Sequence, residues 1–182
     1  TSMPGITVFE VSDANQAKKL LDYSLKLDGP MYIRSSVEPT EDIYGDGIEV
    51  KAGGSLTVVN GDDGAILCSG VVVQYAIEAA KAIEIETGKK IRVVDLYSIK
   101  PIDRAAVINA AKTGTVIVAQ DHNVVGGLGS IVGTIIAEAG ISTKYRVLGI
   151  TDEFVPMAHA TYLYDKFGFD TKGIKKAFFE MR

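Results

Sequence analysis

The sequence predicts an α/β fold, in which a mostly parallel β-sheet carries helices on both faces in three αβα layers. Short apolar runs alternate with stretches of helical periodicity, which is the order that strand–helix–strand units produce. Runs such as residues 65–68 and 115–119 are apolar throughout instead of at every second position. Uninterrupted apolar runs of this length are typical of strands that are covered on both sides.

A first strand–helix–strand unit is predicted in residues 6–34. An apolar run of strand length opens it, a helix over residues 13–25 follows, and the second strand covers residues 31–34. Ser12 and Asp13 stand where the helix begins, and their side-chain oxygens can accept the free N–H groups of its first turn.

Residues 37–62 predict a linker with short strands, because glycines, acids and serines replace the apolar runs. Residues 47–51 and 55–60 are expected to pair as a hairpin around a turn at Gly53 and Gly54. This linker is the best candidate for a domain boundary.

A second α/β pattern fills residues 63–182. Its apolar runs and helical stretches predict about four main strands, with helices between them on both faces. The expected strands are residues 65–68, 91–96, 115–119 and 145–150, and the expected helices are residues 71–87, 104–112, 128–138, 161–167 and 171–181.

The composition excludes several classes of protein. Apolar residues make up 47% of the chain and charged residues 23%, as in ordinary globular proteins. The net charge of −4 gives no basic surface for nucleic acid. No apolar run reaches the roughly 18 residues that span a membrane, and no secretory signal opens the chain. The single cysteine, Cys68, excludes an internal disulfide, so we expect a cytoplasmic protein with Cys68 as a small buried side chain.

The glycine-rich run DHNVVGGLGS at residues 121–130 is the main candidate for a binding site. It follows a predicted strand and opens a predicted helix, whose free N–H groups could hold an anion. Close packing of the helix against the strand is the alternative, because glycines at such turns also serve packing. The candidate residues for an anion site or an interface are His122, Gly126, Gly127, Gly129 and Ser130.

No metal site and no catalytic residue follow from the residue pattern. His122 could transfer protons or form a hydrogen bond at an interface, but no partner is evident in the sequence. No set of His, Cys and acidic residues has the spacing of a zinc site.

Six segments together resemble the C-terminal part of transketolases. Each segment is weak alone, but all six follow the order and spacing of that family across nearly the whole chain. They are residues 3–8, 12–15, 29–34, 98–103 (SIKPID), 121–130 and 167–174.

The resemblance implies a domain assignment. Residues 1–36 would form the tail of a pyrimidine-binding domain, and residues 63–182 a transketolase C-terminal domain. Met3 would then be interior sequence. A full transketolase, or the C-terminal subunit of a split one, would carry more chain upstream, and the catalytic glutamate of the family would lie there.

The resemblance also implies an activity for the parent enzyme: two-carbon ketol transfer between ketose and aldose phosphates, in the pentose phosphate pathway. The parent would use thiamine diphosphate and Mg²⁺, but this chain alone would bind neither and would be inactive, with a structural role in assembly. Gly-Asp-Gly at residues 45–47 begins like the family's magnesium motif but lacks its downstream part, so we interpret it as a turn. The expected partners are the remaining transketolase domains or an N-terminal subunit, in a homodimer or heterotetramer.

One position departs from the family. An arginine that helps to hold the sugar phosphate usually stands three residues beyond the position of Arg34, where this chain has Val37. Valine cannot form bidentate hydrogen bonds with phosphate. Either Arg34 or an upstream group binds the substrate instead, or the substrate is not a usual sugar phosphate.

Two alternatives remain open. The parent could be a 1-deoxyxylulose-5-phosphate synthase or the beta subunit of a 2-oxoacid dehydrogenase, which share this domain order. The chain could also be a non-enzymatic module that binds an anion or a partner at the glycine-rich turn.

Overall fold

The computed structural model describes residues 1–37 and 39–181. Strands and helices alternate along most of this length, as the sequence predicts. The strands are β1 (Thr7–Glu10), β2 (Met31–Arg34), β3 (Leu56–Val59), β4 (Ala65–Cys68), β5 (Arg92–Asp95), β6 (Ser98–Lys100), β7 (Thr115–Asn123) and β8 (Lys144–Ile150), and the helices are α1 (Ala14–Ser24), α2 (Val72–Thr87), α3 (Arg104–Ala111), α4 (Leu128–Glu138), α5 (Ala160–Phe167) and α6 (Thr171–Glu180).

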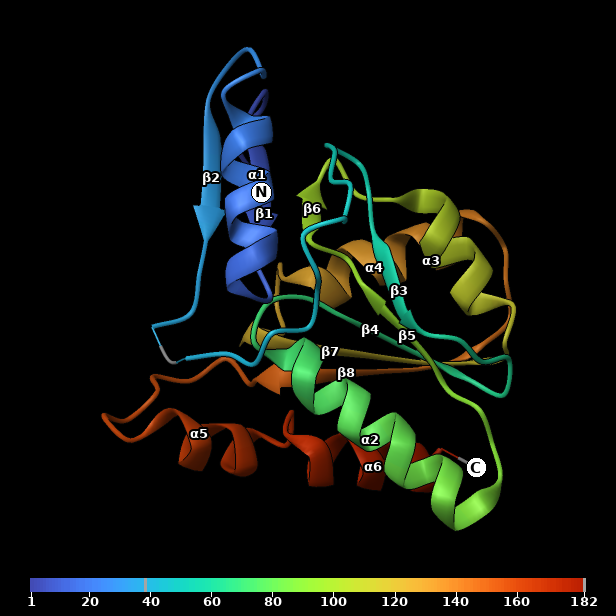
Figure 1. The fold of residues 1–182 in the computed structure, drawn as a ribbon. Helices are drawn as coiled ribbons and strands as arrows, with labels where there is room; N and C mark the ends of the chain where they lie inside the picture. Colours follow the sequence, from blue (N-terminus) through green and yellow to red (C-terminus); the bar gives the residue numbers. More distant parts are fainter. Residues whose placement is uncertain (38, 182) are drawn as a thin grey trace.

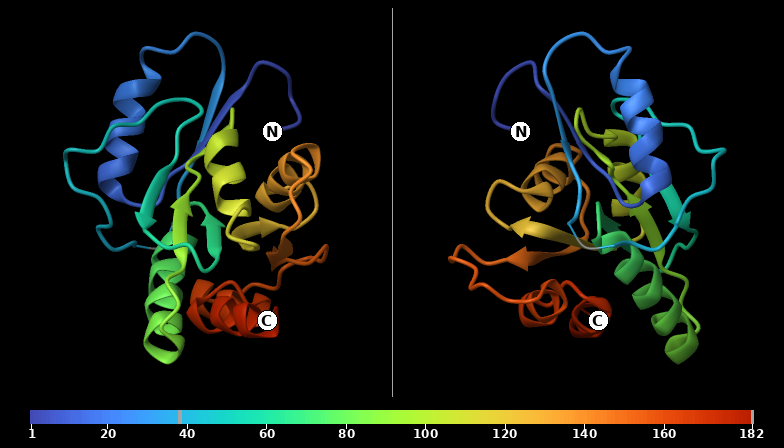
Figure 2. Two further views of the ribbon diagram at one scale, coloured as in Figure 1. Left: turned by 90° about the vertical axis from the view of Figure 1, so that its right-hand side faces the viewer. Right: turned by 60° about the vertical axis from the view of Figure 1, so that its left-hand side comes forward.

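The larger sheet has five strands in the order β3-β5-β4-β7-β8. All neighbouring pairs are parallel except β3 with β5, which is antiparallel. Helices α2, α5 and α6 lie on one face of this sheet, and α3 and α4 lie on the other (Figure 1). Figure 2 shows the same three layers from two further sides. The predicted αβα fold class is therefore confirmed.

The central strand β4 shows why its residues are apolar at every position. Ile66 and Cys68 pack into the core beneath α2 and α6, and both are fully buried. Ala65 and Leu67 point to the opposite side and pack into the core beneath α3 and α4. Successive side chains of a strand point to opposite faces, so a sheet covered on both faces needs apolar residues at each position. Complete burial of a side chain such as Leu67 contributes about 1.5–3 kcal/mol.

β1, α1 and β2 form a unit of their own, which we call the N-terminal unit (residues 7–34). β1 pairs in parallel with β2 and antiparallel with β6, which gives a second sheet in the order β2-β1-β6. Phe9, Leu20 and Tyr97 are almost fully buried between this unit and the rest of the chain. The short strand β6 therefore attaches the N-terminal unit to the C-terminal part.

The predicted hairpin in residues 47–60 is not formed. Residues 47–51 are not in a strand, and β3 pairs instead with β5 at the edge of the large sheet. An isolated two-stranded ribbon is marginally stable, whereas an edge position lets β3 extend an existing core. Asp46 lies in an exposed turn, as expected. The assignment of residues 1–36, 37–62 and 63–182 to separate domains stays a prediction.

Candidate functional site

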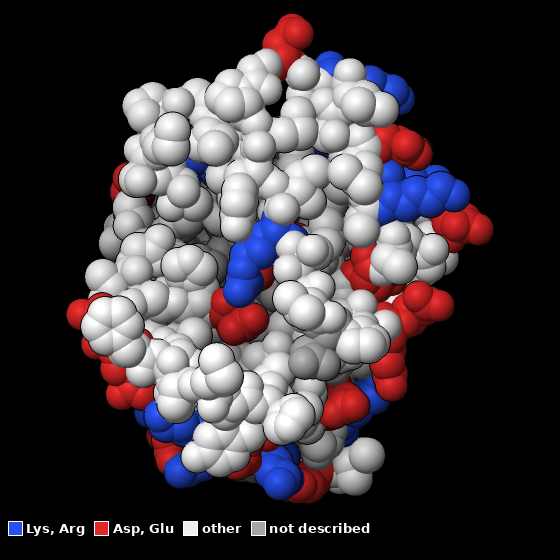
Figure 3. Space-filling model, turned by 90° about the vertical axis from the view of Figure 1, so that its left-hand side faces the viewer, with Lys and Arg blue, Asp and Glu red and all other residues white. Residues whose placement is uncertain are grey.

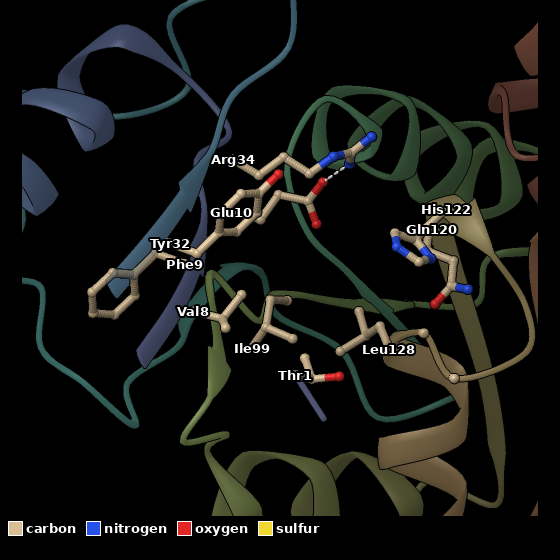
Figure 4. Close-up of a pocket in the computed structure, with 12 residues that line it drawn as sticks. Thr1, Val8, Phe9, Glu10, Tyr32, Arg34, Ile99, Gln120, His122 and Leu128 are labelled. Atoms are coloured by element: carbon tan, nitrogen blue, oxygen red, sulfur yellow. Dashed lines mark hydrogen bonds and ion pairs between the residues drawn. The ribbon is translucent and has the colours of Figure 1, made fainter. Parts of the chain in front are cut away.

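A cavity of about 250 Å³ lies between the N-terminal unit and the glycine-rich turn (Figure 4). One wall comes from β1 and β2, and the facing wall comes from the end of β7 and the start of α4. The lining has an apolar part that includes Val8, Ile99 and Leu128, and a polar part that includes Glu10, Arg34 and His122. The lining residues are Thr1, Val8, Phe9, Glu10, Tyr32, Arg34, Ile99, Gln120, His122, Gly126, Gly127 and Leu128.

Arg34 is the main cation of this cavity, and two carboxylates hold it. Its guanidinium forms an ion pair with Glu10, drawn in Figure 4, and a second one with Asp121 Oδ2 at 3.2 Å. Burial lowers the pKa of Arg34, but the charges of Glu10 and Asp121 outweigh it and raise the pKa above its usual value. The second oxygen of Glu10 accepts a hydrogen bond from Ser69 Oγ at 2.6 Å. Arg34 thus lies at the cavity, and its predicted substrate role stays a prediction.

The glycine-rich turn forms the facing wall, and backbone conformation explains one of its glycines while close packing explains another. Gly126 has φ +74°, which residues with a Cβ rarely adopt. A Cβ on Gly129 would lie 2.5 Å from Val147 Cγ1. Two N–H groups of the turn are already used, since Gly126 donates to Ser130 Oγ and Gly129 donates to Gln120 Oε1. These contacts favour the packing interpretation, and anion binding at the turn stays a prediction.

His122 also lines this cavity. Its ring is exposed, and Nδ1 lies 3.2 Å from the carbonyl oxygen of Asn123. The structure therefore brings Arg34, His122, Gly126 and Gly127 together around one cavity. Gly129 and Ser130 lie in the first turn of α4 and are not among the residues that line the cavity.

Sequence reasoning missed Glu10, Ser69 and Gln120 as members of this site. Glu10 ends β1, Ser69 directly follows β4, and Gln120 lies just past the middle of β7. The carboxyl ends of parallel strands meet at one edge of an open α/β sheet, where polar residues gather. That rule applied to β4 and β7 would have found Ser69 and Gln120, whereas Glu10 belongs to the second sheet and reaches Ser69 through a non-local contact.

A second polar cluster is fully buried between the N-terminal unit and the large sheet. Asp95 Oδ2 accepts three hydrogen bonds of 2.8 Å, from Ser12 Oγ, Gln16 Nε2 and the Tyr44 hydroxyl. Asp95 Oδ1 has no hydrogen-bond partner among the described residues. Burial raises the pKa of Asp95 to about 7, although the three donors oppose this shift.

Cys68 lies near this cluster and is fully buried, as predicted. Burial raises the pKa of its thiol well above the usual value, so the reactive thiolate form is disfavoured. Among the described residues, no three His, Cys, Asp or Glu side chains are placed to hold a metal ion. None of the helices in residues 1–37 and 39–181 has the length and apolarity required to cross a bilayer.

Comparison with known proteins identifies the class of this domain. Residues 53–174 match the family model described as the transketolase C-terminal domain. The chain belongs to the transketolase family.

Particular relatives refine this assignment. The chain is 33% identical over 181 residues to one subunit of the apulose-4-phosphate transketolase of Phocaeicola vulgatus, with 98% of this chain and 57% of the relative covered. It is 32% identical to 1-deoxy-D-xylulose-5-phosphate synthase 1 of Geobacter sulfurreducens, with 96% of this chain and 28% of the relative covered. A split-gene transketolase solved as an inactive β4 tetramer superposes with a TM-score of 0.93 at 30% identity, with 99% of this chain and 59% of that chain covered. The chain thus spans little more than half the length of the subunit-type relatives that it matches.

Proposed function

We propose that this chain is the C-terminal part of a thiamine-diphosphate-dependent transketolase and needs an N-terminal partner part for activity. The observation that carries this proposal is the similarity over 99% of the chain to the split-gene transketolase, whose β4 tetramer is inactive. The relative in Phocaeicola vulgatus is likewise a subunit and not a whole enzyme. In this role the chain supplies one wall of the substrate site and part of the assembly.

In the part of the chain that the structure describes, no cluster of three or more His, Cys, Asp or Glu side chains is placed to hold Mg²⁺. Mg²⁺ on a diphosphate usually takes one or two protein carboxylates, and phosphate oxygens and water complete its coordination. The two cavity carboxylates, Glu10 and Asp121, are both engaged by Arg34. We therefore expect thiamine diphosphate and Mg²⁺ to be bound by the partner part.

An exposed apolar surface supports a partner. Tyr32, Val125, Phe154 and Met157 are exposed, although they are large and apolar. The Asn123 side chain donates to Asp152 Oδ1 at 3.1 Å, which ties the loop of Phe154 and Met157 to the glycine-rich turn. β2 and the segment between β8 and α5 lie on the left-hand side of Figure 1, and Figure 3 shows that side, where a broad central area has few charged side chains. Uncharged surfaces of this kind mark protein interfaces, and we assign this one to the N-terminal partner part.

The test combines the purified chain with a polypeptide that supplies the N-terminal part of transketolase, thiamine diphosphate and Mg²⁺. We expect ketol transfer from a ketose donor only in the combined sample. Phe154→Asp should raise the concentration of chain needed for half-maximal activity at least tenfold, because it buries a charge in the interface. The matched control is Ile85→Asp on α2, which is also exposed and should have little effect. Turnover by the chain alone would refute the proposal.

The substrate and the pathway of the parent enzyme are part of the same proposal. The activity assay of the combined sample also tests which substrate is used. One relative is a transketolase of apulose 4-phosphate and another makes 1-deoxyxylulose 5-phosphate, so the family includes several sugar chemistries. Comparison of ketose donors with pyruvate distinguishes a transketolase from a deoxyxylulose-phosphate synthase. We expect ketose donors to be used, because the split-gene transketolase superposes over 99% of the chain with a TM-score of 0.93.

A further inference from the structure

Two carboxylates, Glu10 and Asp95, form hydrogen bonds across the boundary between the N-terminal unit and the large sheet, each from a different side. Glu10 of β1 reaches across to Ser69, which follows β4. Asp95 of β5 reaches the other way, to Ser12 and Gln16 of the N-terminal unit. Tyr44 completes the second contact from the linker loop. The cavity lies on this boundary, so its width depends on how the two parts dock.

Asp95 differs from an ordinary buried ion-pair residue. Its side chain is fully buried, and none of the ion pairs found in the described residues includes it. The titratable groups that face it are neutral or acidic. They are Tyr44 from the linker loop, Glu10 from β1, Cys68 from β4 and Tyr97 after β5.

The three donors fix the geometry of the contact. Gln16 cannot turn its amide freely, because its Oε1 accepts the Ser12 N–H at 2.8 Å, which leaves Nε2 to donate to Asp95. Tyr44 is held by its own N–H, which donates to Asp13 Oδ2 at 2.7 Å. Ser12 and Gln16 therefore reach Asp95 only while the N-terminal unit is docked, and Tyr44 is tied to the same unit through Asp13.

We propose that protonation of Asp95 controls how tightly the N-terminal unit docks against the large sheet, and thereby sets the shape of the cavity. We call this contact the Asp95 joint. The joint is independent of the proposed function, since it rests on contacts within this chain. It makes Asp95 a positioning residue that touches no substrate.

The sign of the pH effect follows from the burial of Asp95. An exposed aspartate has a pKa of about 3.9, whereas burial raises the pKa of docked Asp95 to about 7. Between these values the docked form binds a proton and the undocked form does not. Docking is therefore strongest at low pH, weakens about tenfold per pH unit as pH rises toward 7, and then levels off.

Hydrogen exchange tests the joint directly. The reporter is the Glu10 N–H, which donates to the Tyr97 carbonyl at 2.9 Å across the boundary. After correction for the intrinsic exchange rate, its protection should fall at least tenfold between pH 5.5 and 7.5. The β4 amides report global opening and should keep their protection. Asp95→Asn should make the Glu10 profile flat, and Asp46→Asn, which removes an exposed charge, should leave it unchanged.

Two results would overturn the proposal: an unchanged pH profile in Asp95→Asn, or β4 amides that lose protection in parallel with Glu10. If Asp95→Asn does not fold, the pH profile of the Tyr44→Phe variant tests the proposal instead. This substitution removes one donor that favours the carboxylate, so the midpoint of the profile should move to higher pH. The matched control Tyr162→Phe changes an exposed hydroxyl and should not move it. A midpoint that stays in place in Tyr44→Phe would also refute the joint.

Discussion

At the scale of single residues, the glycine-rich turn shows how one pattern can serve packing and binding alike. The sequence predicts a turn with free N–H groups, and both interpretations need glycine. Side-chain contacts distinguish them, because the space above Gly129 is filled by Val147 and two of the N–H groups of the turn are already bonded. Such contacts join residues of different strands and helices, so the sequence around residue 129 does not reveal them.

Gly129→Ala should therefore destabilise the protein. The new Cβ would lie 2.5 Å from Val147 Cγ1 and 3.2 Å from its Cβ, which forces α4 away from β8. We expect a loss of about 1–3 kcal/mol, measured by urea unfolding. Gly133→Ala in the same helix is the control. Its Cβ would meet Tyr145 at 3.4 Å, an ordinary contact, so the better helix propensity of alanine should stabilise the protein or leave it unchanged. Equal losses in both variants would contradict this account.

At the scale of elements, local signals predict the helices well and the strand pairing poorly. Helix α4 spans the predicted residues 128–138, and Asp103 caps α3 by accepting the Ala106 N–H. Both features are predictable because helical periodicity and capping depend on residues that are close together in the sequence. β6 was not predicted, since three residues carry no periodicity and its partner β1 lies about 90 positions away in the chain. The pairing of β3 with β5 is non-local in the same way.

Asp13 joins two elements, and its replacement should cost more than the loss of a helix cap. Its Oδ1 caps α1 by accepting the Gln16 N–H, while Oδ2 accepts the N–H groups of Ile43 and Tyr44. Asp13→Ala leaves all three donors without this partner, so we expect a loss of about 2–4 kcal/mol in urea unfolding.

Asp170→Ala is the matched control for Asp13→Ala. Asp170 caps α6 through a single hydrogen bond from the Gly173 N–H. Its replacement should cost about 1 kcal/mol. If the two variants lost the same stability, the link from Asp13 to the linker loop would contribute nothing.

At the scale of the whole molecule, the part of the chain that matches the family model is shorter than the part that forms the packed structure. The family model begins at residue 53, but every donor to Asp95 comes from earlier in the chain. Tyr97 also lies in one buried cluster with Phe9 and Leu20 of the N-terminal unit. The resemblance could predict the family and the three layers, because it depends on short motifs whose order along the chain can be read from the sequence. It could not predict that residues 1–52 complete the core, since that depends on contacts between distant segments.

A chain that begins at residue 53 should therefore be much less stable than the full chain. It would expose Tyr97, and Asp95 would lose Ser12, Gln16 and Tyr44 together. For a domain of this size, a loss of about 3 kcal/mol lowers the midpoint of thermal unfolding by roughly 6–12 °C. We expect a shift at least this large in circular dichroism, with increased binding of a hydrophobic dye to the exposed Tyr97 region. Removal of residues 1–4 alone, which precede β1, is the control and should change the midpoint little. An unchanged midpoint in the longer truncation would show that the family domain is complete without the N-terminal unit.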